Sequence, residues 1–236
     1  MWNEIALLQI CEVAASKAPV DVLVSEPYLP YVPEGWNGTL VLAEAQNLGG
    51  SPEYLKRLRA APPRTRMLRL GDAEIARSGH VGVGPWDIGP IKLALKAVWP
   101  DIALESVAVS NAVPWSRASS SGANANPDDL MIDHAVEFWR QLVDCWQPDL
   151  RHVVTVGKVA REVAKRLFVD GASLLPLRSP SPNYLRRIAG MFCSSDLLRR
   201  YPEVAAAVEQ VGSPDGDADS AVFFACHAVS IARTLR

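Results

Sequence analysis

The sequence contains few cysteines, and they stand far apart. Its 236 residues include four, Cys11, Cys145, Cys193 and Cys226, and no Cys-x-x-Cys pair. Zinc and iron–sulfur centres usually need closely spaced cysteine ligands, so this spacing argues against a metal or cluster site. Cys11, Cys145 and Cys226 fall in apolar helical patterns, which favours buried free thiols for these three. We therefore expect no bound metal.

Long apolar runs and a basic leader are also lacking. No apolar run approaches the ~18 residues that a membrane span requires. The first residues, Met1 to Glu4, do not have the positive charge that opens a secretory signal. We expect a cytoplasmic protein with no membrane partner. The length and the ordinary composition, 49% hydrophobic and 21% charged, predict one globular domain over 1–236.

The chain also lacks a strong overall charge, but its charges are unevenly distributed. The formal net charge is −2, which does not by itself indicate a nucleic-acid-binding protein. Residues 151–200, however, carry ten lysines or arginines against three acids, a local net charge of +7. For Lys165 and Arg166 we favour a solvated helix face. Arg178, Arg186 and Arg187 flank a loop, where contact with phosphates is the stronger interpretation.

Short apolar runs alternate with helical periodicities along the chain. The runs predict strands over 39–45, 105–113, 152–156 and 173–177. The periodicities predict helices over 3–16, 90–98, 130–146, 158–168, 194–211 and 220–235. This alternation indicates an α/β fold, a three-layer sandwich in which helices flank a central four-stranded parallel sheet.

Polar clusters lie at the carboxyl ends of three of the predicted strands. They are Glu44 to Asn47, Asn111, and Ser179 to Arg187. Because parallel strands have their carboxyl ends at one edge of a sheet, where α/β proteins bind ligands, we expect these clusters to converge there. Glu44 is the best catalytic candidate, and a structural or capping carboxylate is its alternative role.

Five segments, in this order, resemble motifs of the uracil-DNA glycosylase superfamily. Residues 43–47 look like the Gly-Glu-Ala-Pro-Gly motif of its thermophilic-type branch, and residues 179–182 like its His-Pro-Ser-Pro loop. Residues 84–93, 110–114 and 148–160 resemble the ring-supplying segment, the strand end with the base-reading asparagine, and the strand–glycine–helix segment. The resemblance covers roughly residues 38–190. The chain does not have the iron–sulfur cysteines of that branch at matching positions.

The resemblance implies catalytic roles for Glu44, Asn47 and Ser179. Glu44 would stabilise the oxocarbenium-like sugar or position the attacking water. Asn47, with Gln46, stands where the family has Pro-Gly and could hold that water. Ser179 replaces the family's histidine, so a neutral hydroxyl would donate to the departing base where a cation is usual.

Base binding is expected from Ala45, Gln46, Trp86 and Asn111. The Asn111 amide offers a donor and an acceptor to a pyrimidine edge, and Trp86 could stack on a flipped base. The alternatives are a strand-terminating turn asparagine and a core tryptophan. A long separation between Glu44 and Trp86 marks an insertion relative to the family.

The segment after the fourth strand is expected to contact DNA. Ser181 would bond a phosphate, Arg186 and Arg187 would neutralise phosphates, and Tyr184 or Leu185 would wedge into the gap left by the flipped nucleotide. Its alternative is an ordinary proline-rich turn before a helix.

Taken with the resemblance, these residues predict a monofunctional, monomeric DNA glycosylase without a cofactor. It would remove uracil, and related deaminated bases, from DNA and release uracil as its product. A non-catalytic member that binds DNA or a nucleobase is the alternative, because the histidine is missing. A hydrolase or transferase of small nucleotides on the same fold is a third reading.

Overall fold

The structure is a computed structural model that describes residues 4–19, 22, 25–27, 30, 32–43, 60, 62, 90–115, 127–146, 149–167, 173–178, 191, 193–212 and 218–235. The strands are β1 (Thr39–Ala43), β2 (Ala108–Asn111), β3 (His152–Val156) and β4 (Ser173–Leu177). The helices are α1 (Glu4–Ser16), α4 (Pro90–Val98), α5 (Asp129–Trp146), α6 (Lys158–Leu167), α8 (Ser194–Arg200), α9 (Pro202–Val211) and α10 (Ala218–Thr234). None of these helices is long and apolar enough to cross a membrane.

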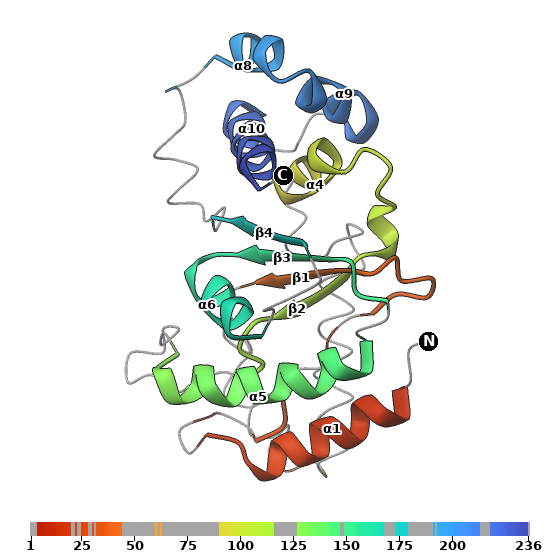
Figure 1. The fold of residues 1–236 in the computed structure, drawn as a ribbon, viewed down its shortest axis with the longest axis vertical. Coiled ribbons are helices and arrows are strands. Elements are labelled where there is room, and N and C mark those ends of the chain that lie inside the picture. The colour runs from red at the N-terminus through yellow and green to blue at the C-terminus, as the bar shows by residue number, and fades with distance from the viewer. Residues whose placement is uncertain are drawn as a thin grey trace.

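The four strands form one parallel sheet between two layers of helices (Figure 1). Helices α4 and α10 cover one face, with α8 and α9 beyond them. Helices α5 and α6 cover the other face, and α1 packs outside α5. The predicted three-layer α/β sandwich with a four-stranded parallel sheet is confirmed.

The strand order β2-β1-β3-β4 reverses direction after the first crossover. The chain steps from β1 to β2 on one side, then returns past β1 to add β3 and β4 on the other. Helix α4 therefore lies on one face and α5 and α6 on the other, as right-handed crossovers require. The reversal lies between β1 and β3, and the carboxyl ends of such a strand pair are where open α/β sheets bind ligands.

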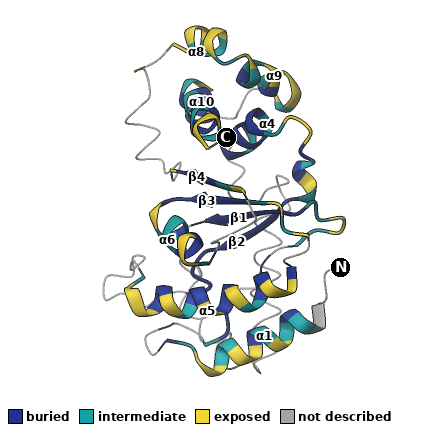
Figure 2. Cartoon of the chain, viewed as in Figure 1, coloured by how far each residue is buried: buried dark blue, intermediate teal, exposed yellow. Residues whose placement is uncertain are grey.

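Apolar strands explain the central position of the sheet. Every residue of β1 and β2 is buried, as the dark blue ribbons in Figure 2 show. Successive side chains of β1 point to opposite faces of the sheet, and each face has its own hydrophobic core. Val41 packs in the core under α4 and α10, whereas Leu40 and Leu42 pack against α5 and α6. This two-sided burial is why the strands are continuous apolar runs in the sequence.

Two predicted elements differ from the structure by more than one or two residues at an end or are divided in it. The strand predicted over 105–113 is confined to Ala108–Asn111. Residues 104–106 form a 3₁₀ turn, in which the amides of Ser106 and Val107 donate to the carbonyls of Ala103 and Leu104 and not to a neighbouring strand. The helical segment predicted over 194–211 is helical but divided in two, since α8 ends before Tyr201 and α9 begins at Pro202. Proline disfavours a helical conformation in the residue before it, and Tyr201 has φ −127° and ψ 76°.

The prediction of buried thiols is correct for Cys11 and Cys226 and wrong for Cys145. Burial raises the pKa of the Cys11 thiol and of the Cys226 thiol to about 12. Cys145 is exposed, because its neighbour Trp146 takes the core-facing position at the end of α5. Cys193, for which no burial was predicted, is exposed as well.

Candidate functional site

Asn111 is the predicted site residue that the structure describes. It is the last residue of β2 and pairs in register with Ala43, the last residue of β1. Only 1% of Asn111 is exposed. Side chains alternate along a strand, so Asn111 shares a face with Val109 and points toward the side covered by α4 and α10. The structure thus puts a buried amide at the carboxyl edge of the sheet, beside the strand that leads into Glu44.

Neither amide atom of Asn111 has a hydrogen-bond partner among the described residues. Both Oδ1 and Nδ2 are fully buried and unpaired there. Burying an unpaired amide costs on the order of 1–3 kcal/mol by protein mutational data, so such groups are rare in native interiors. Asn37 behaves differently, since its Nδ2 donates to the Ala103 carbonyl at 3.0 Å and its Oδ1 accepts from the Thr39 amide at 3.0 Å. Asn37 is therefore a structural asparagine, whereas the Asn111 amide has no comparable partner among the described residues.

The backbone around Asn111 is held on both sides. The amide of Ala112 donates to the Ala43 carbonyl at 2.7 Å. The carbonyl of Ala112 accepts from the indole Nε1 of Trp139 at 2.9 Å, and Trp139 is completely buried in α5. A recognition residue needs such rigid support to keep its hydrogen-bonding edge in place.

The other predicted site residues lie outside the described residues. They are Glu44, Ala45, Gln46, Asn47, Trp86, Ser179, Ser181, Tyr184, Leu185, Arg186 and Arg187. The described residues that precede Glu44 and Ser179 are Ala43 and Arg178, which end or follow β1 and β4. Both segments therefore leave the sheet at the same edge that holds Asn111.

The direction of α4 bears on the segment that contains Trp86. Trp99, directly after α4, stacks on His152 with ring centroids 4.5 Å apart. His152 opens β3, so α4 ends at the amino edge of the sheet. A nine-residue helix is about 13 Å long, and α4 accordingly begins, at Pro90, toward the carboxyl edge. The chain enters this helix from the side of the molecule on which Asn111 lies.

Two further buried polar groups lie near Asn111, and sequence reasoning did not single them out. Ser110 Oγ and Thr155 Oγ1 are buried and have no partner among the described residues. Both pair in register with Leu42 of β1, one residue before the end of the strand, and they face α5 and α6. In the sequence, these two residues could have been recognised as hydroxyl side chains within strands that are otherwise largely apolar.

The positive charge of residues 151–200 is spread over the molecule. Arg166 pairs with Asp133 at 2.6 Å and with Glu162 at 3.2 Å, as expected for a solvated helix face. Arg151 precedes β3 at the amino edge. Arg178 follows β4 at the carboxyl edge, but β4 and the strand of Asn111 lie on opposite sides of the sheet.

The pKa of His227, in α10, is lower than the ordinary histidine value. Burial lowers the pKa of its imidazole, and the charges of Arg178 and Arg161 lower it further. The lowered pKa favours the neutral imidazole. Among the described residues, no group of three or more His, Cys, Asp or Glu side chains could hold a metal ion.

Comparisons with known proteins add no evidence about function to these structural observations. No protein-family model matches the chain, and no curated protein matches it in sequence.

Proposed function

We propose that this chain is a DNA glycosylase that hydrolyses the N-glycosidic bond of uracil, and of related deaminated bases, in DNA. The observation that supports the proposal is Asn111, a buried amide with no partner among the described residues, at the edge where the strands deliver the other candidates. An amide that is costly to leave unpaired is well suited to bind a ligand that supplies both a donor and an acceptor.

The reaction begins with the target nucleotide taken out of the base stack. Asn111 pairs with the carbonyl and imino groups of uracil, and Trp86 stacks on its ring. Glu44 stabilises the cationic sugar or orients the attacking water, and the bond from sugar to base breaks with its electrons going to the base. Ser179 donates one hydrogen bond to the departing base. No lysine is among the candidates, so water is the nucleophile and an abasic site is the product.

The test is a uracil-containing oligonucleotide incubated with the full chain and then heated in alkali, which cleaves at abasic sites. Strand scission by the wild type that falls at least 100-fold in Glu44→Gln and in Asn111→Ala supports the proposal. Glu137→Gln is the control for the loss of a carboxylate, because Glu137 is exposed on α5 and pairs only with its neighbour Arg140 among the salt bridges of the described chain. It should keep wild-type scission.

Two outcomes would contradict the enzyme. A retarded band on a gel with no scission indicates the non-catalytic binding protein, which the serine at position 179 would explain. Hydrolysis of free deoxyuridine that exceeds hydrolysis in DNA indicates an enzyme of small nucleotides instead.

A further inference from the structure

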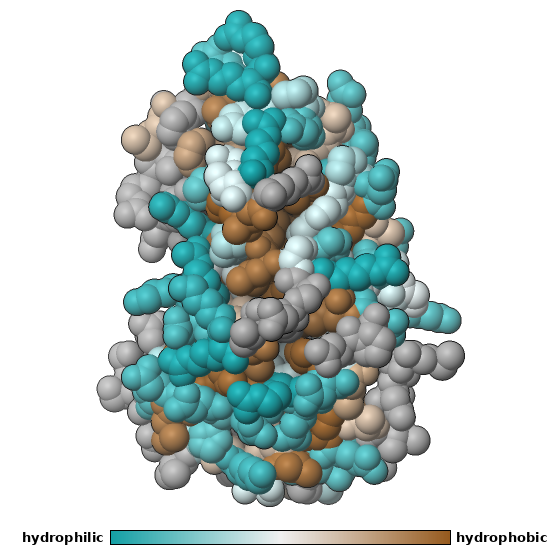
Figure 3. Space-filling view, in the orientation of Figure 1, coloured by the Kyte–Doolittle hydropathy of each residue, from teal (hydrophilic) through white to brown (hydrophobic). Residues whose placement is uncertain are grey.

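A pocket of about 260 Å³ opens at the amino edge of the sheet, away from Asn111. Its lining comes from three parts of the chain that are distant in sequence: the end of α4, the start of β4 and the end of α10. The lining residues are Val98, Trp99, Ser173, Leu174, Leu175, Ala232 and Leu235. On the face seen in Figure 3, hydrophobic side chains gather where β4 runs below α10 and α4, with hydrophilic surface on both sides.

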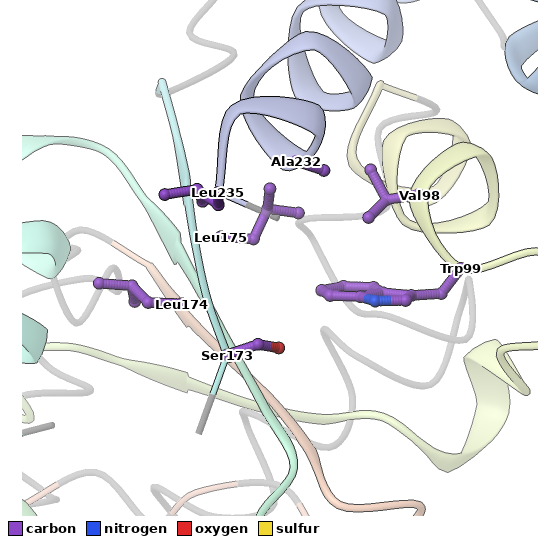
Figure 4. A pocket seen from close by; sticks show the side chains of 7 residues that line it. All are labelled: Val98, Trp99, Ser173, Leu174, Leu175, Ala232 and Leu235. Carbon is purple, nitrogen blue, oxygen red and sulfur yellow. The ribbon is translucent and has the colours of Figure 1, made fainter. Parts of the chain in front are cut away.

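The indole of Trp99 forms one wall of this pocket. It reaches from α4 toward β4, and in the close view it points at the strand beside Leu175 and Ser173 (Figure 4). Its stacking on His152, at 4.5 Å between centroids and 30° between planes, fixes its orientation. The opposing wall is aliphatic, with Ala232 and Leu235 at the end of α10. A rigid aromatic wall facing aliphatic side chains suits a flat apolar guest.

The polar end of the pocket is a hydrogen-bond acceptor. Ser173 Oγ lies 2.6 Å from His152 Nδ1 and 3.5 Å from the Arg151 carbonyl oxygen. In one imidazole tautomer the hydroxyl donates to Nδ1, and in the other it accepts from Nδ1 and donates to the carbonyl. In both cases the hydroxyl proton is used and an oxygen lone pair of Ser173 remains for a ligand.

We propose that this pocket binds a small planar aromatic molecule of one or two rings that carries an N–H or O–H donor. The ring lies between Trp99 and the aliphatic wall, and the donor points to Ser173 Oγ. The volume limits the guest to this size, since pockets that bind drug-sized ligands have volumes of roughly 300–1,000 Å³. The site is separate from the proposed catalytic edge, because its residues lie at the opposite ends of β4 and α4.

Indole and 1-methylindole are matched probes for the full chain. Both are flat bicyclic rings, but only indole has an N–H donor. In calorimetric titrations we expect saturable one-to-one binding of indole, about two- to tenfold tighter than that of 1-methylindole. Ser173→Ala should weaken indole by the same factor and leave 1-methylindole unchanged. Leu130→Ala, an exposed leucine on α5, is the control and should bind both probes as the wild type does.

Filling the pocket tests its location. Ala232→Phe should weaken both probes at least tenfold, and Leu235→Trp, at a residue that is 60% exposed, should do the same if the first variant does not fold. Binding that survives both substitutions, or the absence of saturable indole binding, would overturn the site. An equal effect of Ser173→Ala on the two probes would overturn the role of the hydroxyl. Uracil excision by the wild type is a separate measurement. Whether it is present or absent, the expected results for indole binding stay the same.

Discussion

Two asparagines in the same protein show how a single residue's role depends on its partners. Asn37 has both amide groups bonded to backbone atoms and closes the approach to β1. Asn111 is more deeply buried, and within the described structure it has no bonded partner. The free energy of folding therefore gains from the first amide and loses from the second. Under the proposed function, this loss of stability accompanies ligand binding by Asn111, and both stability and binding can be measured.

Replacing the two asparagines should change stability in opposite directions. Asn111→Val removes two unpaired buried polar atoms and puts a β-branched side chain in a strand, so the free energy of unfolding should rise by about 1–3 kcal/mol. Uracil excision should be lost in the same variant. Asn37→Val should lower the free energy of unfolding by about 1–2 kcal/mol, because it leaves a carbonyl and an amide unpaired. Urea denaturation measures both values, and an Asn111→Val variant less stable than the wild type would argue for a structural role.

The two half-buried histidines should make stability depend on pH. Burial lowers the pKa of His152 and of His227, with smaller contributions from nearby arginines. The unfolded chain then binds more protons than the folded chain below the ordinary histidine pKa of about 6.5. The free energy of unfolding should consequently fall as the pH is lowered from 7.5 to 5.5.

The pH effect can be assigned by substitution. In His152→Gln combined with His227→Gln, the fall in unfolding free energy between pH 7.5 and 5.5 should be smaller than in the wild type. Denaturation curves at several pH values provide the measurement. A fall of equal size in the double variant would show that other groups cause it.

At the scale of elements, the turn before β1 sets the position of two strands. The Gly38 carbonyl accepts from the amides of Arg151 at 2.8 Å and His152 at 3.1 Å, so it joins the starts of β1 and β3. Gly38 has φ +83°, and a Cβ there would lie 2.2 Å from the carbonyl oxygen of Asp149. Only glycine fits this turn without moving the backbone.

Gly38→Ala should therefore be much more costly than Gly35→Ala. Gly35 has a similar φ of +72°, but a Cβ there would meet nothing within 4 Å. We expect Gly35→Ala to lower the free energy of unfolding by about 1–2 kcal/mol from backbone strain alone. The close approach to Asp149 should add at least ~2 kcal/mol in Gly38→Ala. Equal urea midpoints for the two variants would contradict this account.

At the scale of the whole molecule, the doubly wound sheet separates two edges with different properties. The carboxyl edge carries Asn111 and the chain segments that lead to Glu44 and to the 179–187 segment. The amino edge carries Trp99, His152 and the apolar pocket. DNA contact is proposed for the first edge alone, so charge substitutions should affect binding according to their position in the fold.

The salt dependence of DNA binding tests this assignment. Arg186→Ala with Arg187→Ala should weaken binding for all sequences and reduce the slope of log affinity against log salt by about 1–2. Arg166→Ala is the control, because that guanidinium already pairs with Asp133 and Glu162. Fluorescence anisotropy at several salt concentrations gives the slopes. An unchanged slope in the arginine pair would remove the 179–187 segment from the DNA-binding surface.

The sequence alone predicted the fold class and most of the elements. The runs at 152–156 and 173–177 became strands with those bounds, because apolar periodicity reports burial, which local sequence encodes directly. It also indicated Asn111 as a strand-end residue. The break at Pro202 was readable from the proline but was overlooked, and the short β2 results from the 3₁₀ turn at 104–106 that precedes it.

Tertiary structure decided which distant residues meet. The strand order put Asn111 beside Ala43, and no local pattern contains that pairing. The absence of a bonded partner for the Asn111 amide in the described chain, and the pocket between α4, β4 and α10, likewise arise from contacts across many residues. Hydrophobic burial depends on each residue's own chemistry, whereas hydrogen-bond satisfaction and cavity shape depend on neighbours that only the folded chain brings together.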